Sequence, residues 1–328
     1  MELPAELKSA IDRLLDGTPL NDLRRAARAL SARYRAEIRD GRLHVADDRA
    51  ARAYLATRLP ATYAAIRASL AYAADLLPDF APKSMLDIGA GPGTAVFAAA
   101  HCWPTLENAL LVEKSPAMRE VGGEIAANAT AIRTEWVSGD AEMAFPESER
   151  ADLVTAGYLL DEIDPDAIGP LVERLWNLTK GLLVLIEPGT PAGWQRILTV
   201  RRTLIAADAS IVAPCPHDHD CPLTSPDWCH FARRVARSRL HRQAKEADVP
   251  WEDEKYIFLA ASRMPPERIS ARVLAPPRQS SGVVRLKWCN ADGSASERLL
   301  SRREGALFKS ARRLDWGDAL PDGRDDPN

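Results

Sequence analysis

The sequence predicts an α/β fold, in which a mostly parallel sheet follows a helical region and precedes a small β-rich appendage. Between residues 81 and 263, short apolar segments alternate with helical ones, and a glycine-rich turn follows the first apolar segment. Strands that alternate with helices are typical of a parallel, doubly wound sheet. The 328 residues are enough for roughly two domains.

Residues 1–80 are predicted to form the helical N-terminal region. They are rich in Ala, Leu and Arg at helical spacing, and Asn21 and Asp47 are the expected N-caps. Pro60 should break or kink the third helical segment because it lacks a backbone donor. The chain has no apolar run of the roughly 20 residues that a membrane span needs, and no signal-peptide core. We therefore expect a cytosolic protein.

Residues 81–263 are predicted to form the sheet domain, which includes a cysteine-rich loop at 213–231. Of its first five expected strands, the first covers residues 85–88. The second ends at Glu113, the third ends at Asp140, the fourth begins at Ala151 and the fifth ends before Pro188. Helices are expected over about 115–129, 193–208 and 229–245, the last of them basic, and the segment YIFLAASR is a further strand.

Residues 264–320 differ in character from the sheet domain. They are basic and resemble a set of short strands, with a hairpin turn at Asp292 and Gly293. We expect a small β-rich appendage there. Residues 321–328 are expected to be a frayed tail.

The segment LDIGAGPGT places Gly89, Gly91 and Gly93 between the first strand and its helix. Glycines let the backbone turn sharply and approach a ligand, which the N–H groups at the start of the helix then face. A glycine-rich turn alone is weak evidence, because dinucleotide-binding folds share it.

Three acidic residues sharpen this prediction. Asp87 precedes the turn, and Glu113 ends the next strand, where an acid can accept both ribose hydroxyls. Asp140 ends the third strand, where an acid can face an adenine amino group. Over about residues 80–190 the pattern resembles the class I S-adenosylmethionine-dependent methyltransferases, whose seven-stranded sheet holds the nucleoside at the carboxyl ends of its strands. A Rossmann-type oxidoreductase is the alternative.

No catalytic residue is assigned. The fourth strand reads TAGYLLDEI and lacks the Asn/Asp-Pro-Pro-aromatic motif of many nucleic-acid amino-methyltransferases, and no Pro-Cys nucleophile for cytosine methylation is present. Tyr158, Asp161 and Glu162 are the polar candidates at the strand end, and they are equally consistent with loop and cap residues. Cys102 is expected to be a small buried side chain.

The segment CPHDHDCPLTSPDWCH gathers three of the five cysteines and three of the six histidines. Cys215, Cys221 and Cys229 are separated by five and seven residues, which is wider than in typical zinc sites. Clustered cysteines in a reducing cytosol indicate a metal site more often than disulfides, and a 4Fe–4S cluster requires four thiolates. We favour Cys289 over Cys102 as the fourth ligand, because a link from the loop to the appendage would fix a domain without a large core.

Histidine is the rival ligand in this loop. One of His217, His219 and His230 could complete a zinc site with three cysteines. A solvated polar loop is the third interpretation, and the sequence favours iron–sulfur only slightly over zinc.

Two basic segments flank the cysteine positions. Residues 231–245 contain no acid, and residues 298–313 contain one. Arginine suits bidentate contact with phosphate, so two positive faces on a chain of net charge −3 indicate a localised anionic partner, unless they are solvated helix faces. The predicted RNA-binding residues are Arg233, Arg234, Arg237, Arg242, Lys309, Arg312 and Arg313.

Five segments together resemble one family: RLPATYAA, LDIGAGPGT, IEPGTPAG, APCPHDHDCPL with WCHF, and FKSARRLDWGD. They are similar to the methyltransferase-like proteins of the mitochondrial small ribosomal subunit and their bacterial relatives, over about residues 45–318. The resemblance implies association with small-subunit ribosomal RNA during assembly or early translation. It also implies a 4Fe–4S cluster held by Cys215, Cys221, Cys229 and Cys289.

The predicted function is therefore that of a small-subunit assembly or translation factor that binds ribosomal RNA, S-adenosylmethionine and a structural 4Fe–4S cluster. The alternative is an active S-adenosylmethionine-dependent rRNA methyltransferase with a structural zinc or iron–sulfur site. A radical or redox enzyme is a third hypothesis, but the C-x3-C-x2-C signature of radical enzymes is absent. We expect a monomer off the ribosome, no membrane partner, and a bacterial cytoplasmic location because no organelle-type leader is seen.

Overall fold

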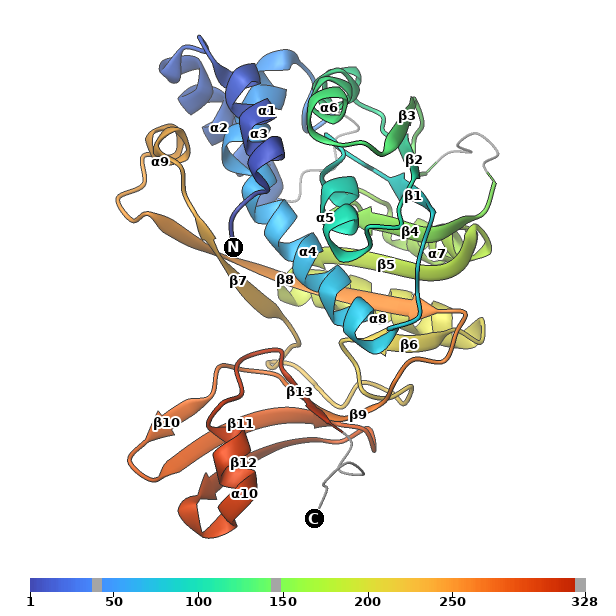
Figure 1. Ribbon diagram of the computed structural model, residues 1–328, viewed down its shortest axis with the longest axis vertical. Helices are drawn as coiled ribbons and strands as arrows, with labels where there is room; N and C mark the ends of the chain where they lie inside the picture. The colour runs from blue at the N-terminus through green and yellow to red at the C-terminus, as the bar shows by residue number, and fades with distance from the viewer. Residues whose placement is uncertain (37–42, 143–148, 322–328) are drawn as a thin grey trace.

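Two β-sheets organise the molecule, which the computed structural model describes over residues 1–36, 43–142 and 149–321 (Figure 1). Within these residues the large sheet has eight strands. They are β1 Ser84–Ile88, β2 Asn108–Val112, β3 Arg133–Val137, β4 Ala151–Gly157, β5 Thr179–Pro188, β6 Ser210–Ala213, β7 Phe231–Ala236 and β8 Trp251–Ser262.

The strand order of the large sheet is β3-β2-β1-β4-β5-β8-β6, and β7 pairs with β8 beside this path. Strands β1 to β5 are mutually parallel, whereas β8 runs antiparallel to β5 and to β6. The fold is therefore the predicted class I methyltransferase-like α/β fold. Its central strands are almost continuously apolar, because helices cover both faces of the sheet.

Helices surround the large sheet as Figure 1 shows, with α4, α5 and α6 on one face and α7 and α8 on the other. Their bounds are α1 Ala5–Leu15, α2 Leu20–Arg35, α3 Asp48–Thr57, α4 Leu59–Leu76, α5 Thr94–Cys102, α6 Pro116–Ala129, α7 Ile168–Asn177, α8 Pro191–Ala206 and α9 Arg239–Lys245. A short 3₁₀ turn at Pro165–Ala167 leads into α7. The N-terminal helices share one apolar core with the sheet. Of the helices described, none is both long and apolar enough to cross a bilayer.

The N-terminal helices test three predictions. Asp47 is the N-cap of α3, and its carboxylate accepts a hydrogen bond from the Ala50 N–H at 2.8 Å, as expected. Asn21 is not an N-cap, because α2 begins one residue earlier, after Pro19. Pro60 lies in the first turn of α4, where no backbone donor is needed, so the predicted break is confirmed.

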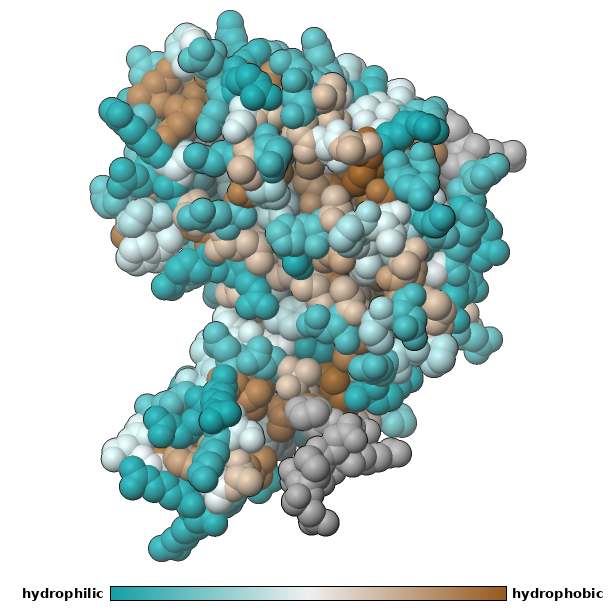
Figure 2. Space-filling model, in the orientation of Figure 1, coloured by the Kyte–Doolittle hydropathy of each residue, from teal (hydrophilic) through white to brown (hydrophobic). Residues whose placement is uncertain are grey.

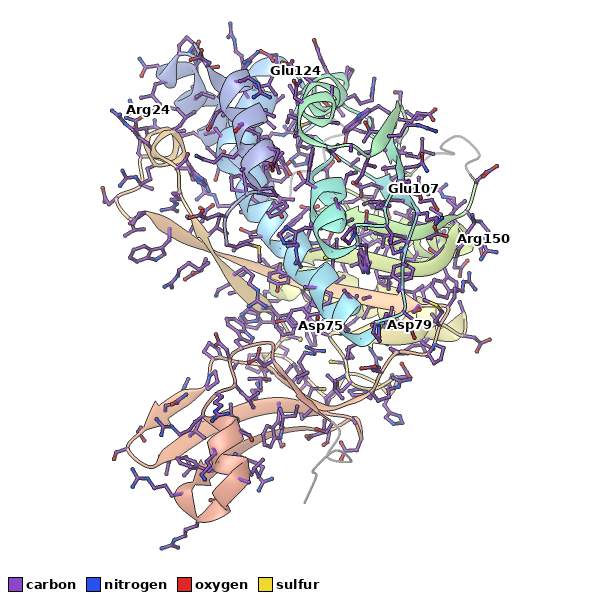
Figure 3. All side chains as sticks on the ribbon, in the orientation of Figure 1. Arg24, Asp75, Asp79, Glu107, Glu124 and Arg150 are labelled. Carbon is purple, nitrogen blue, oxygen red and sulfur yellow. The ribbon has the colours of Figure 1, made fainter. Side chains whose placement is uncertain are left out.

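The predicted basic helix at 229–245 is mostly wrong. Its first half is strand β7, which pairs antiparallel with the first half of β8, and only α9 is helical. Phe231 and Val235 lie on the same face of β7 and are buried, so the segment has an apolar face as a strand. The ribbon of β7 and β8 carries α9 against α2, where Arg24 donates to the Gln243 carbonyl at 3.0 Å (Figure 3).

The second sheet forms a C-terminal lobe. Its strands are β9 Ile269–Val273, β10 Arg278–Ser280, β11 Val283–Asn290, β12 Ala295–Ser301 and β13 Ala319–Pro321. The predicted hairpin at Asp292 and Gly293 joins β11 to β12, and Gly293 has φ +86°. A 3₁₀ turn (Arg302–Glu304) and helix α10 (Gly305–Ala311) were not predicted. Of the predicted tail, 322–328 lie outside the described residues.

The lobe has its own small core and a narrow junction with the body. The core consists of Ala271, Val273, Val284, Leu286, Trp288, Leu300, Phe308 and Ala311. Figure 2 shows hydrophilic residues over most of the outer surface of the lobe, with apolar residues near the junction. Because this core is small, contacts at the junction contribute a large share of the stability of the lobe.

Candidate functional site

The glycine-rich turn joins β1 to α5 in left-handed backbone. Gly89, Gly91 and Gly93 have φ of +69°, +54° and +77°, values that other residues rarely adopt. The N–H groups of Gly89 and Ala90 both donate to the Val112 carbonyl at the end of β2. The turn therefore wraps the carboxyl ends of β1 and β2, where the cofactor was predicted to bind.

Glu113, directly after β2, holds this turn in place. One carboxylate oxygen accepts from the Gly91 N–H at 2.8 Å, and the other accepts from the Ser115 N–H at 2.6 Å. Burial raises the pKa of Glu113 against the opposing effect of these hydrogen bonds. Glu113 also lines a cavity, and its carboxylate has acceptor sites beyond those that these two N–H groups use.

The cavity at the carboxyl ends of the strands has about 1090 Å³ of unfilled space, part of it open to solvent. Of the six predicted cofactor-binding residues, the structure brings Gly89, Gly91, Glu113 and Asp140 to its wall. Asp87 and Gly93 are not among the lining residues. Asp87 is buried and accepts a hydrogen bond from the Thr155 hydroxyl at 2.6 Å.

The pKa values of two carboxyl groups here, Asp87 and Asp140, are shifted in opposite directions. Burial raises the pKa of Asp87 to about 7, despite the hydrogen bond from Thr155. Burial acts to raise the pKa of Asp140, but the hydrogen bond from Lys114 at 2.6 Å, the hydrogen bond from the Glu142 N–H and the charge of Lys114 together outweigh burial and lower this pKa. Asp140 is therefore an ionised acceptor, paired with a lysine, on the wall of the cavity.

The polar residues at the end of β4 lie beside the same cavity. Tyr158 and Glu162 line it, and Asp161 is buried. Burial and then the charge of Asp161 raise the pKa of Glu162 to about 8. The Glu162 side chain is nevertheless 39% exposed, and it lies 3.9 Å from the His44 imidazole.

The N-terminal helices supply lining residues that the sequence did not reveal. Tyr34, from α2, stacks on His44 with ring centroids 4.9 Å apart, and Tyr54 comes from α3. Three of the six tyrosines of the chain thus line one cavity. In the sequence they lie far apart, and two of them are in Ala- and Arg-rich helices, where an aromatic residue is usually read as core.

All four predicted cysteine ligands line a second, mostly apolar pocket with about 500 Å³ of unfilled space. Cys215, Cys221 and Cys229 come from the loop between β6 and β7, and Cys289 comes from β11 of the lobe. Burial raises the pKa of Cys229, and the other three thiols raise it further. Cys102 ends α5 and is not in this pocket.

Two buried arginines and one histidine surround the cysteine pocket. Arg201 donates to the His217 carbonyl at 2.9 Å, and Arg272 donates to the Pro214 carbonyl at 2.7 Å. His217 is buried, and its Nε2 lies 3.3 Å from the Cys289 sulfur. Burial and then the charges of Cys215 and Cys221 raise the pKa of Cys289 to about 12. In the described part of the chain, no three thiol, imidazole or carboxylate groups are grouped closely enough to hold a metal ion.

The first basic segment is largely neutralised by acidic and aromatic neighbours. Arg234 pairs with Asp253 at 2.9 Å, and Arg237 pairs with Glu252 at 3.0 Å. Arg233 donates instead to the Tyr72 hydroxyl at 2.8 Å. Arg233, Arg234 and Arg237 therefore face partners on β8 and α4 and present less net charge than the sequence suggested.

The second basic segment has fewer acidic partners than the first. Lys309, Arg312 and Arg313 are exposed on and just after α10, and among the described residues no acidic side chain pairs with them. Figure 3 shows nitrogen-tipped side chains that extend outward from this end of the lobe. We call Lys309, Arg312 and Arg313 the α10 basic edge.

Comparisons with known proteins complete the description. The family model for the mitochondrial small ribosomal subunit protein Rsm22 matches residues 48–321. The human protein named ribosome assembly protein METTL17, mitochondrial, is 28% identical over 290 residues, which cover 82% of this chain and 62% of that protein. Rsm22-cox11 tandem protein 2, mitochondrial, of Schizosaccharomyces pombe is 23% identical over 321 residues, 82% of this chain and 43% of that protein.

Solved structures include similar folds. Magnesium protoporphyrin IX methyltransferase from Synechocystis PCC 6803 with bound SAM has a TM-score of 0.42 at 13% identity, covering 80% of this chain and all of that one. The chain spans less than two thirds of the length of either curated relative. The family and both relatives are described as mitochondrial, so the predicted bacterial cytoplasmic location is wrong.

Proposed function

The chain belongs to the family of the mitochondrial small ribosomal subunit protein Rsm22, and we propose that it is a small-subunit assembly factor that binds ribosomal RNA, S-adenosylmethionine and a structural 4Fe–4S cluster. The observation that carries this proposal is the convergence of four cysteines on one pocket at the junction of body and lobe. The relative named as a ribosome assembly protein supports the assembly role.

The chemistry of the cysteine pocket fits an iron–sulfur group. Cys215, Cys221, Cys229 and Cys289 would be its ligands, which is the four-thiolate set that such clusters use. When bound, a cluster with four thiolate ligands supplies a rigid link between the segments that carry them. The guanidinium groups of Arg201 and Arg272 are buried beside the thiols and offset the negative charge of thiolates in an apolar site.

The cofactor cavity fits S-adenosylmethionine. The left-handed turn at Gly89 and Gly91 leaves backbone exposed to the cavity, and Glu113 and Asp140 supply acceptors just after the ends of two neighbouring strands. These groups suit the ribose hydroxyls and the adenine amino group of a nucleoside. When bound, S-adenosylmethionine supplies an electrophilic methyl group.

The α10 basic edge is the proposed contact with ribosomal RNA. Its three cations have no acidic partner among the described residues, so binding to phosphate would not first have to break ion pairs. Arg233, Arg234, Arg237 and Arg242 remain proposed contacts of second rank, because at least two of them are paired. The link through Cys289 would hold the lobe, and with it this edge, against the body.

Metal analysis tests the proposal. Anaerobically purified protein should contain about four iron and four sulfide per chain and show visible charge-transfer absorption. Cys289→Ser should lose most of the iron, whereas Cys102→Ser, a matched change outside the pocket, should keep it. One equivalent of zinc in the wild type, or unchanged iron in Cys289→Ser, would contradict the proposed ligand set.

An active S-adenosylmethionine-dependent rRNA methyltransferase is the second candidate function. The observation that favours it is a further cavity that shares Tyr34, Tyr54 and Tyr158 with the cofactor cavity. A methyltransferase needs an acceptor site next to its cofactor, and a scaffold does not. Incubation with labelled S-adenosylmethionine and small-subunit rRNA should label the RNA if this function is present.

A further inference from the structure

A cavity separate from the cysteine pocket adjoins the cofactor cavity. It has about 830 Å³ of unfilled space, part of it open to solvent. Tyr34, Tyr54 and Tyr158 line both cavities, so these three side chains form the wall between them. Arg58 and Glu254 line only the second cavity. Any molecule in the second cavity would thus lie next to the cofactor across an aromatic wall.

Tyr158 has an unusual backbone. Its φ is +57°, a left-handed conformation that is rare for a bulky aromatic residue and is typically retained where function requires it. The chain is fixed there because the Tyr158 N–H donates to the Ile186 carbonyl at 2.7 Å. The phenol hydroxyl donates to the Glu254 carboxylate at 2.9 Å. The ring is therefore held at both ends.

The second cavity also carries a cation and an anion side by side. The Arg58 guanidinium lies 3.7 Å from the Glu254 carboxylate, and these side chains are 24% and 14% exposed. Arg58 also lies 5.5 Å from the centre of the Tyr34 ring. Although burial alone would lower the pKa of Arg58, Glu254 raises it, so the side chain stays charged.

This combination specifies the class of ligand. Two basic residues, Arg35 and Arg58, and two acidic residues, Asp161 and Glu254, line the cavity, so it has no excess of cations that would favour an isolated phosphate. The Tyr34 ring is already covered by His44 and Arg58. Tyr54 and Tyr158 are the remaining tyrosines of the wall, and unpaired bases stack on flat apolar rings of this kind. Arg58 offers only donors and Glu254 only acceptors, which matches the adjacent acceptors and donors on the edge of a base. A planar, neutral ligand with both kinds of group satisfies every feature.

We propose that this second cavity binds one unpaired nucleobase, stacked on the tyrosine wall and hydrogen-bonded to Arg58 and Glu254. The inference rests on the second candidate function, an active rRNA methyltransferase, because it assigns to the cofactor cavity an acceptor of the nucleobase class. It needs a base that has left its helix, as enzymes that modify bases in nucleic acids require.

Saturation-transfer difference NMR with the four ribonucleosides tests this proposal. S-adenosylhomocysteine is added first in excess, so that adenosine cannot occupy the cofactor cavity. We expect base protons of at least one nucleoside to receive more saturation than its ribose protons, and ribose 5-phosphate to receive none. Absence of any base signal, or an equal signal from ribose 5-phosphate, would overturn the proposal.

Variants locate the signal. Glu254→Gln and Arg58→Gln should each weaken nucleoside binding at least tenfold. Asp253→Asn is the matched control, because it is one residue away on β8, exposed, and paired with Arg234 instead. Equal nucleoside binding in both cavity variants and the wild type would refute the site.

Calorimetry with S-adenosylhomocysteine separates this inference from the proposed function. Unchanged cofactor affinity in Glu254→Gln shows that the variant is folded. Cofactor binding without nucleoside binding would sink the inference and leave the proposed cofactor role standing. The opposite result is a protein that binds nucleoside but not the cofactor, and whose nucleoside binding Glu254→Gln abolishes. That result would refute the proposed cofactor role and leave the nucleobase site standing.

Discussion

Arg272 is the side chain whose removal should most weaken the attachment of the lobe. It lies on β9 and is 2% exposed. Its guanidinium donates to the Pro214 carbonyl in the cysteine loop at 2.7 Å and to the Gly317 carbonyl at 2.8 Å. It also lies 4.8 Å from the centre of the Tyr72 ring on α4. One side chain thus joins the lobe, the loop and the body.

The expected magnitude follows from these contacts. A hydrogen bond from a charged donor contributes about 1.5–3 kcal/mol, and a desolvated cation–π contact about 2 kcal/mol. The cost of burying the charged guanidinium offsets part of this gain. The same cost lowers the pKa of Arg272. Arg272→Met leaves two carbonyls without their donor, so we expect the free energy of opening the lobe to fall by about 3–5 kcal/mol.

Hydrogen–deuterium exchange of peptides from β9, β11 and β12 measures that opening free energy directly. Arg268→Met is the matched control. Arg268 is another arginine of the lobe region that reaches the loop, but its pair with Asp218 is 45% and 42% exposed and should contribute at most about 1 kcal/mol. If Arg272→Met changed exchange no more than Arg268→Met does, the reasoning would be refuted.

The remaining predictions concern the body and the α10 basic edge. Because burial raises the pKa of Asp87 from 3.8 to about 7, the contribution of Asp87 to stability is fully present below pH 3.8 and is lost, by up to about 4 kcal/mol, as the pH rises through 7. Asp87→Asn should remove this dependence in urea denaturation. Gly91→Ala should weaken S-adenosylmethionine binding about tenfold in calorimetry, because its methyl group enters open cavity space. Changing Lys309, Arg312 and Arg313 to Gln should lower the salt slope of RNA binding by about 2–3.

Each of these predictions has a result that would contradict it. A pH profile shared by wild type and Asp87→Asn would mean that this carboxyl is ionised in the folded protein. Gly123→Ala adds a methyl group in open space on α6, outside the cofactor cavity, and should not change cofactor affinity. Equal affinities for it and Gly91→Ala would remove the turn from the cofactor site. An unchanged salt slope would mean that the α10 basic edge does not contact phosphate.

The fold and half of the site were predictable because their signals are local. Gly89 and Gly91 adopt left-handed backbone, and Glu113 and Asp140 follow the ends of neighbouring parallel strands, so the sheet brings them together at one edge. The prediction missed that the carboxylate of Glu113 holds the turn itself. That role depends on an approach between strand ends that spacing alone does not reveal.

The tyrosine wall was not predictable. Tyr34 and Tyr158 are separated by 124 positions, and nothing in either segment indicates that α2 lies above the end of β4. The prediction of a basic helix at 229–245 was wrong for a related reason. Arg-rich residues 231–236 satisfy helical and strand patterns alike, and pairing with β8 decided between them.

The ribbon of β7 and β8 has a consequence for solubility. Among the described strands β7 pairs with β8 alone, so its other side is a sheet edge that a second molecule could extend. The amino group of Met1 donates to the Arg234 carbonyl and occupies part of that edge. The charged side chains of Arg234 and Asp253 would have to be desolvated when another strand docks. Arg234, which the sequence suggested as part of a basic RNA-binding helix, would thus disfavour edge-to-edge aggregation at this ribbon.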